Sequence, residues 1–199
     1  MKMPKGKFIV FEGLDGAGTT TQAELLIEYL KKQGCKVFVT SEPTNNIIGG
    51  LIRGQLKRHW KTSPGCLQLL FAADRANHIE AEINPALRKG RVVICDRYVL
   101  SSLAYGSLGV DLGWLKAINS RFPKPDLTLF LDTEPKECIK RLKRERCSLE
   151  LFEEERKLRQ VRNNYLKVIR GHGNLVRVNG NRPITSIFAD IKKAVNAVL

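Results

Sequence analysis

The sequence predicts an α/β fold with a five-stranded parallel sheet and helices on both of its faces. Five short apolar runs alternate with longer segments of helical periodicity. The 199 residues, 43% of them hydrophobic, are enough for one domain with a full core. The chain also shows no internal repeat, low-complexity tract or linker. We therefore expect a single domain over residues 1–199.

The first strand and helix are expected near the start of the chain. Lys7–Glu12 is mostly apolar and predicts a buried strand. Thr19–Gln33 predicts a helix, because its apolar residues recur at helical spacing and Gly34, after two lysines, is a typical end. Lys36–Thr40 predicts the second strand, which Glu42-Pro43 closes.

Three later apolar runs predict the other strands, at Arg91–Cys95, Asp126–Asp132 and Asn174–Val178. Segments with apolar residues at helical spacing lie between and after them. The expected helices are Ile47–Lys57, Pro64–Lys89, Val99–Leu108, Leu112–Ser120, Pro135–Arg146, Glu150–Arg170 and a last one from about Ile184 to Val198.

A glycine-rich loop joins the first strand to the first helix. It fits the pattern G-x-x-x-x-G-K-[ST] except that Thr19 stands at the lysine position. In such loops backbone N–H groups and a helix N-terminus converge on phosphate oxygens, and the hydroxyl of Thr20 can ligate phosphate-bound Mg²⁺. A tight turn without a ligand is the alternative. The candidate phosphate-binding residues are Gly13, Asp15, Gly16, Ala17, Gly18, Thr19 and Thr20.

Polar side chains follow the predicted strands, at the edge of the sheet where ligands of such folds bind. Asp96 and Arg97 follow the third strand, which would place a carboxylate near the metal and a guanidinium near phosphate. Glu42 and Asp132 lie at the ends of two other strands, and Arg182 follows the fifth. Asp96 could instead form a surface ion pair or a helix N-cap, but the nearby phosphate loop favours a functional role.

The helix predicted over Pro64–Lys89 carries Phe71 and Arg75 four residues apart, hence on one face. An aromatic ring beside a planar set of donors can hold a base by stacking and by hydrogen bonds to a carbonyl. Phe71 could instead be a core residue, and Tyr105 could likewise serve packing alone.

Composition limits the classes of partner. The net charge of +14 favours anionic partners but does not choose among nucleotides, nucleic acid and an acidic surface. Five dispersed cysteines are typical of reduced intracellular thiols, and three isolated histidines argue against a metal held by protein side chains alone. No apolar stretch suits a membrane span or a signal peptide, so we expect a cytoplasmic protein.

Several motifs occur together along the chain. They are Phe11-Glu-Gly-Leu-Asp-Gly-Ala-Gly18 with Thr20-Thr-Gln22, Glu42-Pro43, Ile52-Arg53, Leu70-Phe-Ala-Ala-Asp-Arg75, Asp96-Arg-Tyr98, Ser101-Ser-Leu-Ala-Tyr105 and Pro125-Asp-Leu-Thr-Leu-Phe-Leu-Asp132. With this set, the chain resembles the thymidylate kinase family over nearly its whole length. The resemblance implies a P-loop NTPase-type three-layer fold, transfer of the ATP γ-phosphoryl group to dTMP with Mg²⁺, and a homodimer.

The resemblance also implies roles for single residues. Phe71 stacks on thymine and Arg75 hydrogen-bonds its ring, with Tyr105 nearby. Asp15 meets the 3′-hydroxyl of the sugar, and Arg97 holds the acceptor phosphate. The other implied roles are acceptor phosphate for Arg53, substrate binding for Glu42, magnesium for Thr20 and Asp96 (the latter through water) and the adenine side for Arg182.

Three positions depart from the family pattern. Thr19 replaces the loop lysine, which would cost about 1.5–3 kcal/mol, or one to two decades of rate, if that contact acted only in the transition state. Leu151 stands where a lid arginine is common, and Gly106 stands where glutamine is common. Since Ala17 leaves no arginine in the loop, we expect the lid, at about residues 141–152, to supply the charge. Its arginines are Arg141, Arg144 and Arg146, and Arg144 and Arg146 are the candidate catalytic residues beside Asp96 and Arg97.

Two other functions fit parts of the sequence. A catalytically weakened kinase could bind nucleotide as a regulator with the same fold. A basic nucleic-acid-binding module would explain the charge, but its usual surface of interleaved aromatic and basic residues is not evident.

Overall fold

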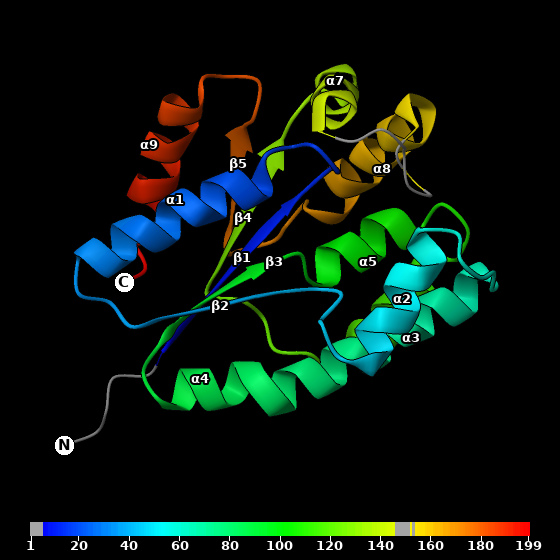
Figure 1. Ribbon diagram of the computed structural model, residues 1–199, viewed down its shortest axis with the longest axis horizontal. Coiled ribbons are helices and arrows are strands. Elements are labelled where there is room, and N and C mark those ends of the chain that lie inside the picture. The colour runs from blue at the N-terminus through cyan, green and yellow to red at the C-terminus, as the bar shows by residue number, and fades with distance from the viewer. Residues whose placement is uncertain (1–5, 146–151, 153) are drawn as a thin grey trace.

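The computed structural model describes residues 6–145, 152 and 154–199, in which the strands form one sheet in the order β2-β3-β1-β4-β5 (Figure 1). Every neighbouring pair is parallel. The strands are β1 (Lys7–Gly13), β2 (Val37–Ser41), β3 (Val92–Asp96), β4 (Leu127–Asp132) and β5 (Leu175–Asn179). The predicted α/β fold with a five-stranded parallel sheet is confirmed.

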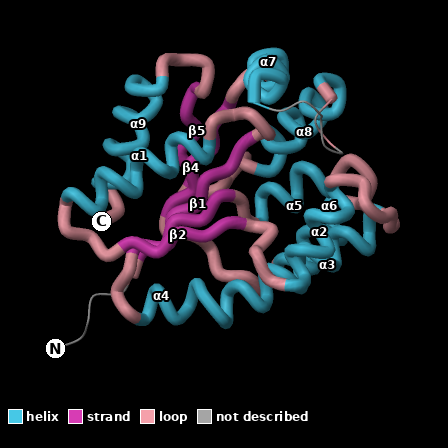
Figure 2. Tube along the Cα trace, in the orientation of Figure 1, coloured by secondary structure: helices cyan, strands magenta, loops and turns pink. Residues whose placement is uncertain are grey.

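Helices surround this sheet, and Figure 2 shows the strands as the middle layer. The helices are α1 (Thr19–Lys32), α2 (Ile47–Leu56), α3 (Pro64–His78), α4 (Asn84–Arg88), α5 (Val99–Gly106), α6 (Leu112–Asn119), α7 (Pro135–Glu145), α8 (Glu155–Val168) and α9 (Ile184–Asn196). Among the described residues, none of these helices has the length and apolar character needed to cross a membrane.

Alternate residues of β1 face opposite layers of helices. Ile9 and Phe11 belong to the core cluster that contains Leu26 of α1. Phe8 and Val10 belong to a second cluster with residues of α4 and the turn before it. Burying one such side chain stabilises the fold by about 1.5–3 kcal/mol, so both faces of the central strand hold the layers together. This double burial explains why the run lacks the polar alternation of a half-exposed strand.

The predicted helix over Pro64–Lys89 contains a break that the sequence analysis missed. Its middle is a π-helical turn, η1 (Ile79–Ile83), in which the Asn84 N–H donates to the carbonyl of Ile79, five residues earlier. The physical reason is Pro85, which has no N–H to donate and whose ring would clash with the preceding turn of a regular helix. The wider turn makes room for the ring, and the helical path continues into α4.

The predicted helix over Glu150–Arg170 was too long at its start. The described part begins at Glu155, where Glu154 has an extended backbone (ψ 135°), and Phe152 lies in a turn. Residues 150, 151 and 153 lie outside the described residues, as do residues 146–151 of the expected lid, which are half of it. The helix ends at Val168, two residues before the expected end.

Asp132, the last residue of β4, joins two layers through its carboxylate. It accepts hydrogen bonds from Arg162 of α8 at 2.7 Å and from the Nε of Arg177 in β5 at 2.9 Å. The carboxylate is 6% exposed. Burial alone would raise the pKa of Asp132, but the two guanidinium groups outweigh it and hold the pKa below the ordinary value of 3.8. Its place at the end of a strand predicts a residue at the ligand edge, but in the structure Asp132 is part of the scaffold.

The Asp132→Asn substitution should lower the free energy of unfolding by about 1–3 kcal/mol at neutral pH, because it weakens hydrogen bonds to charged groups. A carboxyl whose folded pKa is depressed contributes stability above its unfolded pKa and loses it as the pH falls through the folded value. Urea unfolding between neutral pH and about pH 3 should therefore show that the free energies of unfolding of the wild type and the variant converge in acid. Glu155→Gln, which alters an exposed pair with Arg159, is the control and should change stability by less than about 0.5 kcal/mol. A difference in the free energy of unfolding between Asp132→Asn and the wild type that does not vary with pH would contradict this account.

Candidate active site

The loop after β1 has the backbone conformation of a phosphate cradle. Gly16 (φ 77°) and Gly18 (φ 95°) occupy the left-handed region that side chains disfavour. A Cβ on Gly16 would also lie 2.6 Å from the carbonyl oxygen of Cys138 in α7, so the loop and this helix are in direct contact. Gly18 caps α1, whose first residues are Thr19 and Thr20. The loop N–H groups and the positive end of α1 therefore face one anion site.

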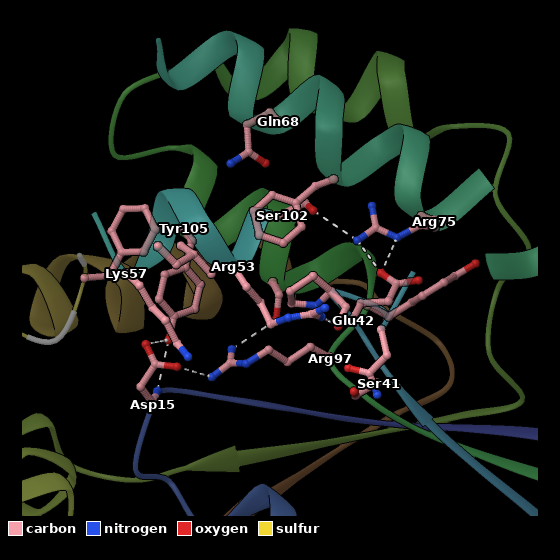
Figure 3. Close-up of a pocket in the computed structure, with 17 residues that line it drawn as sticks. Asp15, Ser41, Glu42, Arg53, Lys57, Gln68, Arg75, Arg97, Ser102 and Tyr105 are labelled. Atoms are coloured by element: carbon pink, nitrogen blue, oxygen red, sulfur yellow. Dashed lines mark hydrogen bonds and ion pairs between the residues drawn. The ribbon is translucent and has the colours of Figure 1, made fainter. Parts of the chain in front are cut away.

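Two cavities meet at this edge of the sheet. The larger, about 580 Å³, is lined by the loop, by Asp96 and by the arginines 141, 144 and 182. The smaller, about 310 Å³, lies between the sheet edge and helices α2, α3 and α5 (Figure 3). Asp15 and Arg97 line both cavities. Two anionic molecules bound in the two cavities would therefore meet at these two side chains.

Arg97 is held at the junction by a dense set of bonds. Its guanidinium donates to Asp15 at 2.6 Å, to the carbonyl of Gly13 at 3.0 Å and to the hydroxyl of Ser101 at 3.2 Å. The Tyr105 hydroxyl donates to the other Asp15 oxygen at 3.0 Å and accepts the Asp15 backbone N–H at 3.0 Å. Burial opposes the charged form, yet Tyr105 and Asp15 keep the pKa of Arg97 well above its ordinary value. Arg97 is thus a permanent cation.

Glu12, the residue before the loop, organises the other side of the junction. Its buried carboxylate accepts hydrogen bonds from the backbone N–H groups of Tyr98 and Ser101. Glu12 of β1 therefore caps the start of α5, a helix that follows β3 in the chain. It also accepts the hydroxyls of Ser101 at 2.6 Å and of Tyr165 in α8 at 3.0 Å. Burial raises the pKa of Glu12, although these hydrogen bonds and the charge of Arg97 lower it. Glu12 therefore joins β1, α5 and α8 directly behind the loop.

Asp96 and Thr20 place a carboxylate and a hydroxyl side by side in the larger cavity, and both groups have oxygen atoms that can ligate a metal ion. The Thr20 hydroxyl donates to the Oδ2 atom of Asp96 at 2.9 Å. The Oδ1 atom of Asp96 is buried and has no hydrogen-bond partner among the described residues. Mg²⁺ prefers such carboxylate and hydroxyl oxygens, usually with several waters. The residues present therefore fit a magnesium ion beside the phosphate loop.

The far end of the smaller cavity contains a buried ionic network. The Arg75 guanidinium, 1% exposed, donates to Glu42 from Nε at 2.8 Å and pairs with it through Nη2 at 2.7 Å. It also donates to Asn119 and Ser102. Behind Glu42, the Nδ1 atom of His78 lies 3.1 Å from its Oε1 atom. Arg75 is therefore fixed in one orientation, in the cavity that Phe71 also lines.

The sequence of this chain is similar to those of known proteins of one family over most of its length. A family model described as thymidylate kinase matches residues 11–191. A probable thymidylate kinase of Pyrococcus horikoshii is 45% identical over 194 residues, which cover 94% of each chain. One of Pyrobaculum calidifontis is 44% identical, with 92% of this chain and 93% of the relative covered. The thymidylate kinase of Pelotomaculum thermopropionicum is 40% identical, with 98% and 95% covered.

This chain belongs to the thymidylate kinase family.

Most of the residues expected from the family motifs lie together on the two cavities. The smaller cavity contains Asp15, Glu42, Arg53, Phe71, Arg75, Arg97 and Tyr105. The larger contains Asp15, Gly16, Ala17, Gly18, Thr19, Thr20, Asp96, Arg97, Arg144 and Arg182. Gly13 ends β1 and accepts Arg97 through its carbonyl. Arg146 lies outside the described residues.

Arg141, the first of the three arginines in the expected lid, contacts the phosphate loop directly. It donates to the carbonyl of Ala17 in the phosphate loop and to the carbonyl of Gly180 after β5, each at 3.1 Å. Glu137, one helical turn earlier, accepts its Nε at 3.3 Å. The contact was not visible in the sequence, because it depends on how closely α7 packs against the loop.

Other residues of the site were missed for a different reason. Ser102, Asn119 and His78 act through Arg75 or Glu42, and no local motif marks them. Gln68 could have been found, because it lies three residues before Phe71 and seven before Arg75, on the same face of α3. It lines the smaller cavity with them.

The Tyr105→Phe substitution should lower the free energy of unfolding by about 1–3 kcal/mol, because it leaves the Asp15 N–H and one carboxylate oxygen without their partner. Tyr29→Phe is the matched control, since among the described residues the Tyr29 hydroxyl bonds only to Asn196, at an exposed position. This variant should change stability by less than about 0.5 kcal/mol. Urea unfolding of the two variants checks this. Equal losses would show that the Tyr105 hydroxyl does not stabilise the junction.

Proposed function

We propose that this protein is a dTMP kinase that transfers the γ-phosphoryl group of ATP to dTMP, giving dTDP and ADP. The observation that carries this proposal is the sharing of Asp15 and Arg97 by two cavities. A donor nucleotide over the glycine loop and an acceptor nucleotide in the smaller cavity would place their phosphates at the same two residues. Direct transfer between two bound nucleotides needs this proximity.

The larger cavity would hold ATP. The loop N–H groups and the start of α1 would bind its phosphates. Thr20 and, through water, Asp96 would hold magnesium, which neutralises phosphate charge when bound. Arg182 lies in this cavity after β5 and pairs with Asp190, and we assign it to the adenine side.

The smaller cavity would hold dTMP. Phe71 would stack on thymine and Arg75, fixed by Glu42, would donate to a ring carbonyl. Asp15 would meet the 3′-hydroxyl, with Tyr105 beside the sugar. Arg97 and Arg53 would bind the acceptor phosphate; Arg53 donates to the carbonyls of Pro43 and Thr44 and lines the cavity.

The reaction at this site would need no general base. The acceptor phosphate is already anionic near neutral pH, so the protein has to align the two phosphates and stabilise the charge that develops between them. Arg97 is suited to this because its planar group binds phosphate oxygens in pairs and stays protonated. Its bond to Asp15 keeps it at the junction before either substrate binds.

The missing loop lysine requires another cation on the ATP side. Thr19 is 7% exposed and uncharged. Arg144 of α7 lines the ATP cavity and makes no hydrogen bond or ion pair with any described residue, whereas Arg141 is bonded to two backbone carbonyls. We therefore assign the charge on the ATP phosphates to Arg144, with Arg146 as a second candidate from the sequence.

Homodimerisation and a cytoplasmic location are also part of this proposal. The exposed faces of α2 and α3 support the dimer. Ile47 and Leu51, four residues apart on α2, are 86% and 47% exposed, and Leu69 on α3 is 52% exposed. The two helices pack against each other, so these apolar side chains lie on neighbouring elements.

Turnover of a panel of nucleoside monophosphates with ATP and Mg²⁺ tests the proposed reaction. We expect ADP and dTDP to form in equal amounts from ATP and dTMP. Binding of both nucleotides without turnover would indicate a regulator with the kinase fold. Salt-sensitive binding of oligonucleotides without turnover would indicate a nucleic-acid-binding protein.

The Arg144→Ala substitution should lower kcat by about tenfold to a hundredfold with little change in KM for dTMP, because it removes a charge-assisted contact to the donor phosphates. Lys143→Ala is the matched control, since Lys143 is the exposed neighbour and does not line the cavity. In a Thr19→Lys background the loss from Arg144→Ala should shrink, because the restored lysine supplies the same charge. Equal losses in both backgrounds would contradict the compensation by Arg144.

A further inference from the structure

The smaller cavity, which we assign to dTMP, contains a buried side-chain amide that no part of the proposed mechanism uses. Gln68 of α3 is 4% exposed, and its Oε1 atom has no hydrogen-bond partner among the described residues. Of the five buried side-chain atoms in this condition in the described part of the chain, it alone lines the smaller cavity. A buried carbonyl without a donor is costly, which favours a ligand as its partner.

The space for this amide comes from Gly106 at the end of α5. A Cβ added to Gly106 would lie 2.9 Å from Cδ and 3.0 Å from Oε1 of Gln68, and 3.0 Å from a methyl of Leu115. Any larger residue at position 106 would therefore displace the amide. Figure 3 shows the Gln68 side chain extending from its helix toward the other residues that line the cavity.

Three side chains on one face of α3 surround the position assigned to the base. Gln68, Phe71 and Arg75 follow the spacing i, i+3, i+7 and all line the cavity. Phe71 offers a ring for stacking, and Arg75 offers only donors. Four of the five N–H groups of Arg75 already have protein acceptors. Nε and one N–H of Nη2 meet Glu42, the other N–H of Nη2 donates to Ser102, and one N–H of Nη1 donates to Asn119. One N–H on Nη1 has no partner among the residues that the structure describes, and it could donate to a base carbonyl.

We propose that Gln68 determines base specificity, with its carboxamide oxygen accepting the N3–H of a pyrimidine-2,4-dione. This inference rests on the proposed dTMP kinase function. Thymine and uracil present one donor, N3–H, between two carbonyl acceptors. In this arrangement the oxygen of Gln68 complements the donor, and the guanidinium of Arg75 complements the C4 carbonyl.

The pair excludes cytosine, although neither residue would do so alone. Cytosine presents an acceptor at N3 and an amino group at C4. An amide can turn to offer its NH₂ group to that acceptor, but Arg75 cannot become an acceptor for the amino group. Because the ionic network fixes Arg75, a cytosine ring would leave two donors facing each other, which is strongly unfavourable in a buried site.

Titration calorimetry with dTMP and its N3-methyl derivative tests the contact without depending on turnover. Wild type should bind dTMP at least about a hundredfold more tightly than the N3-methyl compound, which lacks the donor. Gln68→Ala should weaken dTMP binding by about tenfold to a hundredfold but leave N3-methyl-dTMP binding unchanged or improved, so the ratio collapses. Gln68→Leu should weaken dTMP binding to a similar extent, because it keeps the volume but not the acceptor.

Gln55→Ala is the matched control. Gln55 of α2 is 8% exposed and its Oε1 atom also lacks a partner among the described residues, but it does not line the cavity. Its substitution should change dTMP affinity by less than about twofold. If Gln68→Ala weakens both ligands equally, or if Gln55→Ala has the same effect, Gln68 serves packing and the inference is overturned. If either outcome occurs while the wild type turns over dTMP, the inference about Gln68 fails and the proposed kinase function stands. If the wild type does not bind dTMP, both the inference and the proposed function are refuted.

Discussion

The site depends on the bond between Arg97 and Asp15 at the junction of the two cavities. Arg97 has a left-handed backbone (φ 72°), a conformation that costs an ordinary residue about 1–2 kcal/mol. Its backbone N–H donates to Phe11 at 2.8 Å, and its guanidinium bonds to Gly13, Asp15 and Ser101. These bonds offset the strain and turn the chain after β3 toward the loop after β1.

Two buried carboxylates play a structural part in this site, while several arginines line the cavities. Glu12 caps α5 and Glu42 fixes Arg75. Each carboxylate is below the surface, at 0% and 4% exposure, with its charge directed at a protein partner. The charges of these two carboxylates are therefore compensated within the protein, and guanidinium groups and loop N–H groups are left to face a substrate with several negative charges. The same arrangement explains how the acidic residues of a strongly basic chain can lie so close to phosphate sites without repelling the ligand.

The sequence predicted the parts of this site that local physics determines. Apolar runs gave the strands, and Gly16 and Gly18 marked the loop because their backbone conformation is rarely open to other residues. Asp96 and Arg97 were predictable because parallel strands end at one edge. The interplay of Gln68 and Gly106 was not predictable in this way, since it depends on how α3 packs against α5. The π-helical turn had a local signal in Pro85, which the helical periodicity around it obscured.

In the proposed mechanism, the absence of the loop lysine changes where the charge for catalysis comes from. A lysine in the loop is part of the element that binds the phosphates, so its charge is present whenever the loop is folded. Besides Arg97 at the junction, the arginines that line the larger cavity beside the loop are Arg141 and Arg144 of α7, more than a hundred residues later. Their position depends on the packing of α7 against the loop, through the Arg141 bond to Ala17 and the close approach of Cys138 to Gly16. Stabilisation of the transferring group is thereby coupled to a tertiary contact. Changes that loosen α7 should weaken catalysis even when they touch no ligand, because the cation would no longer be held in place.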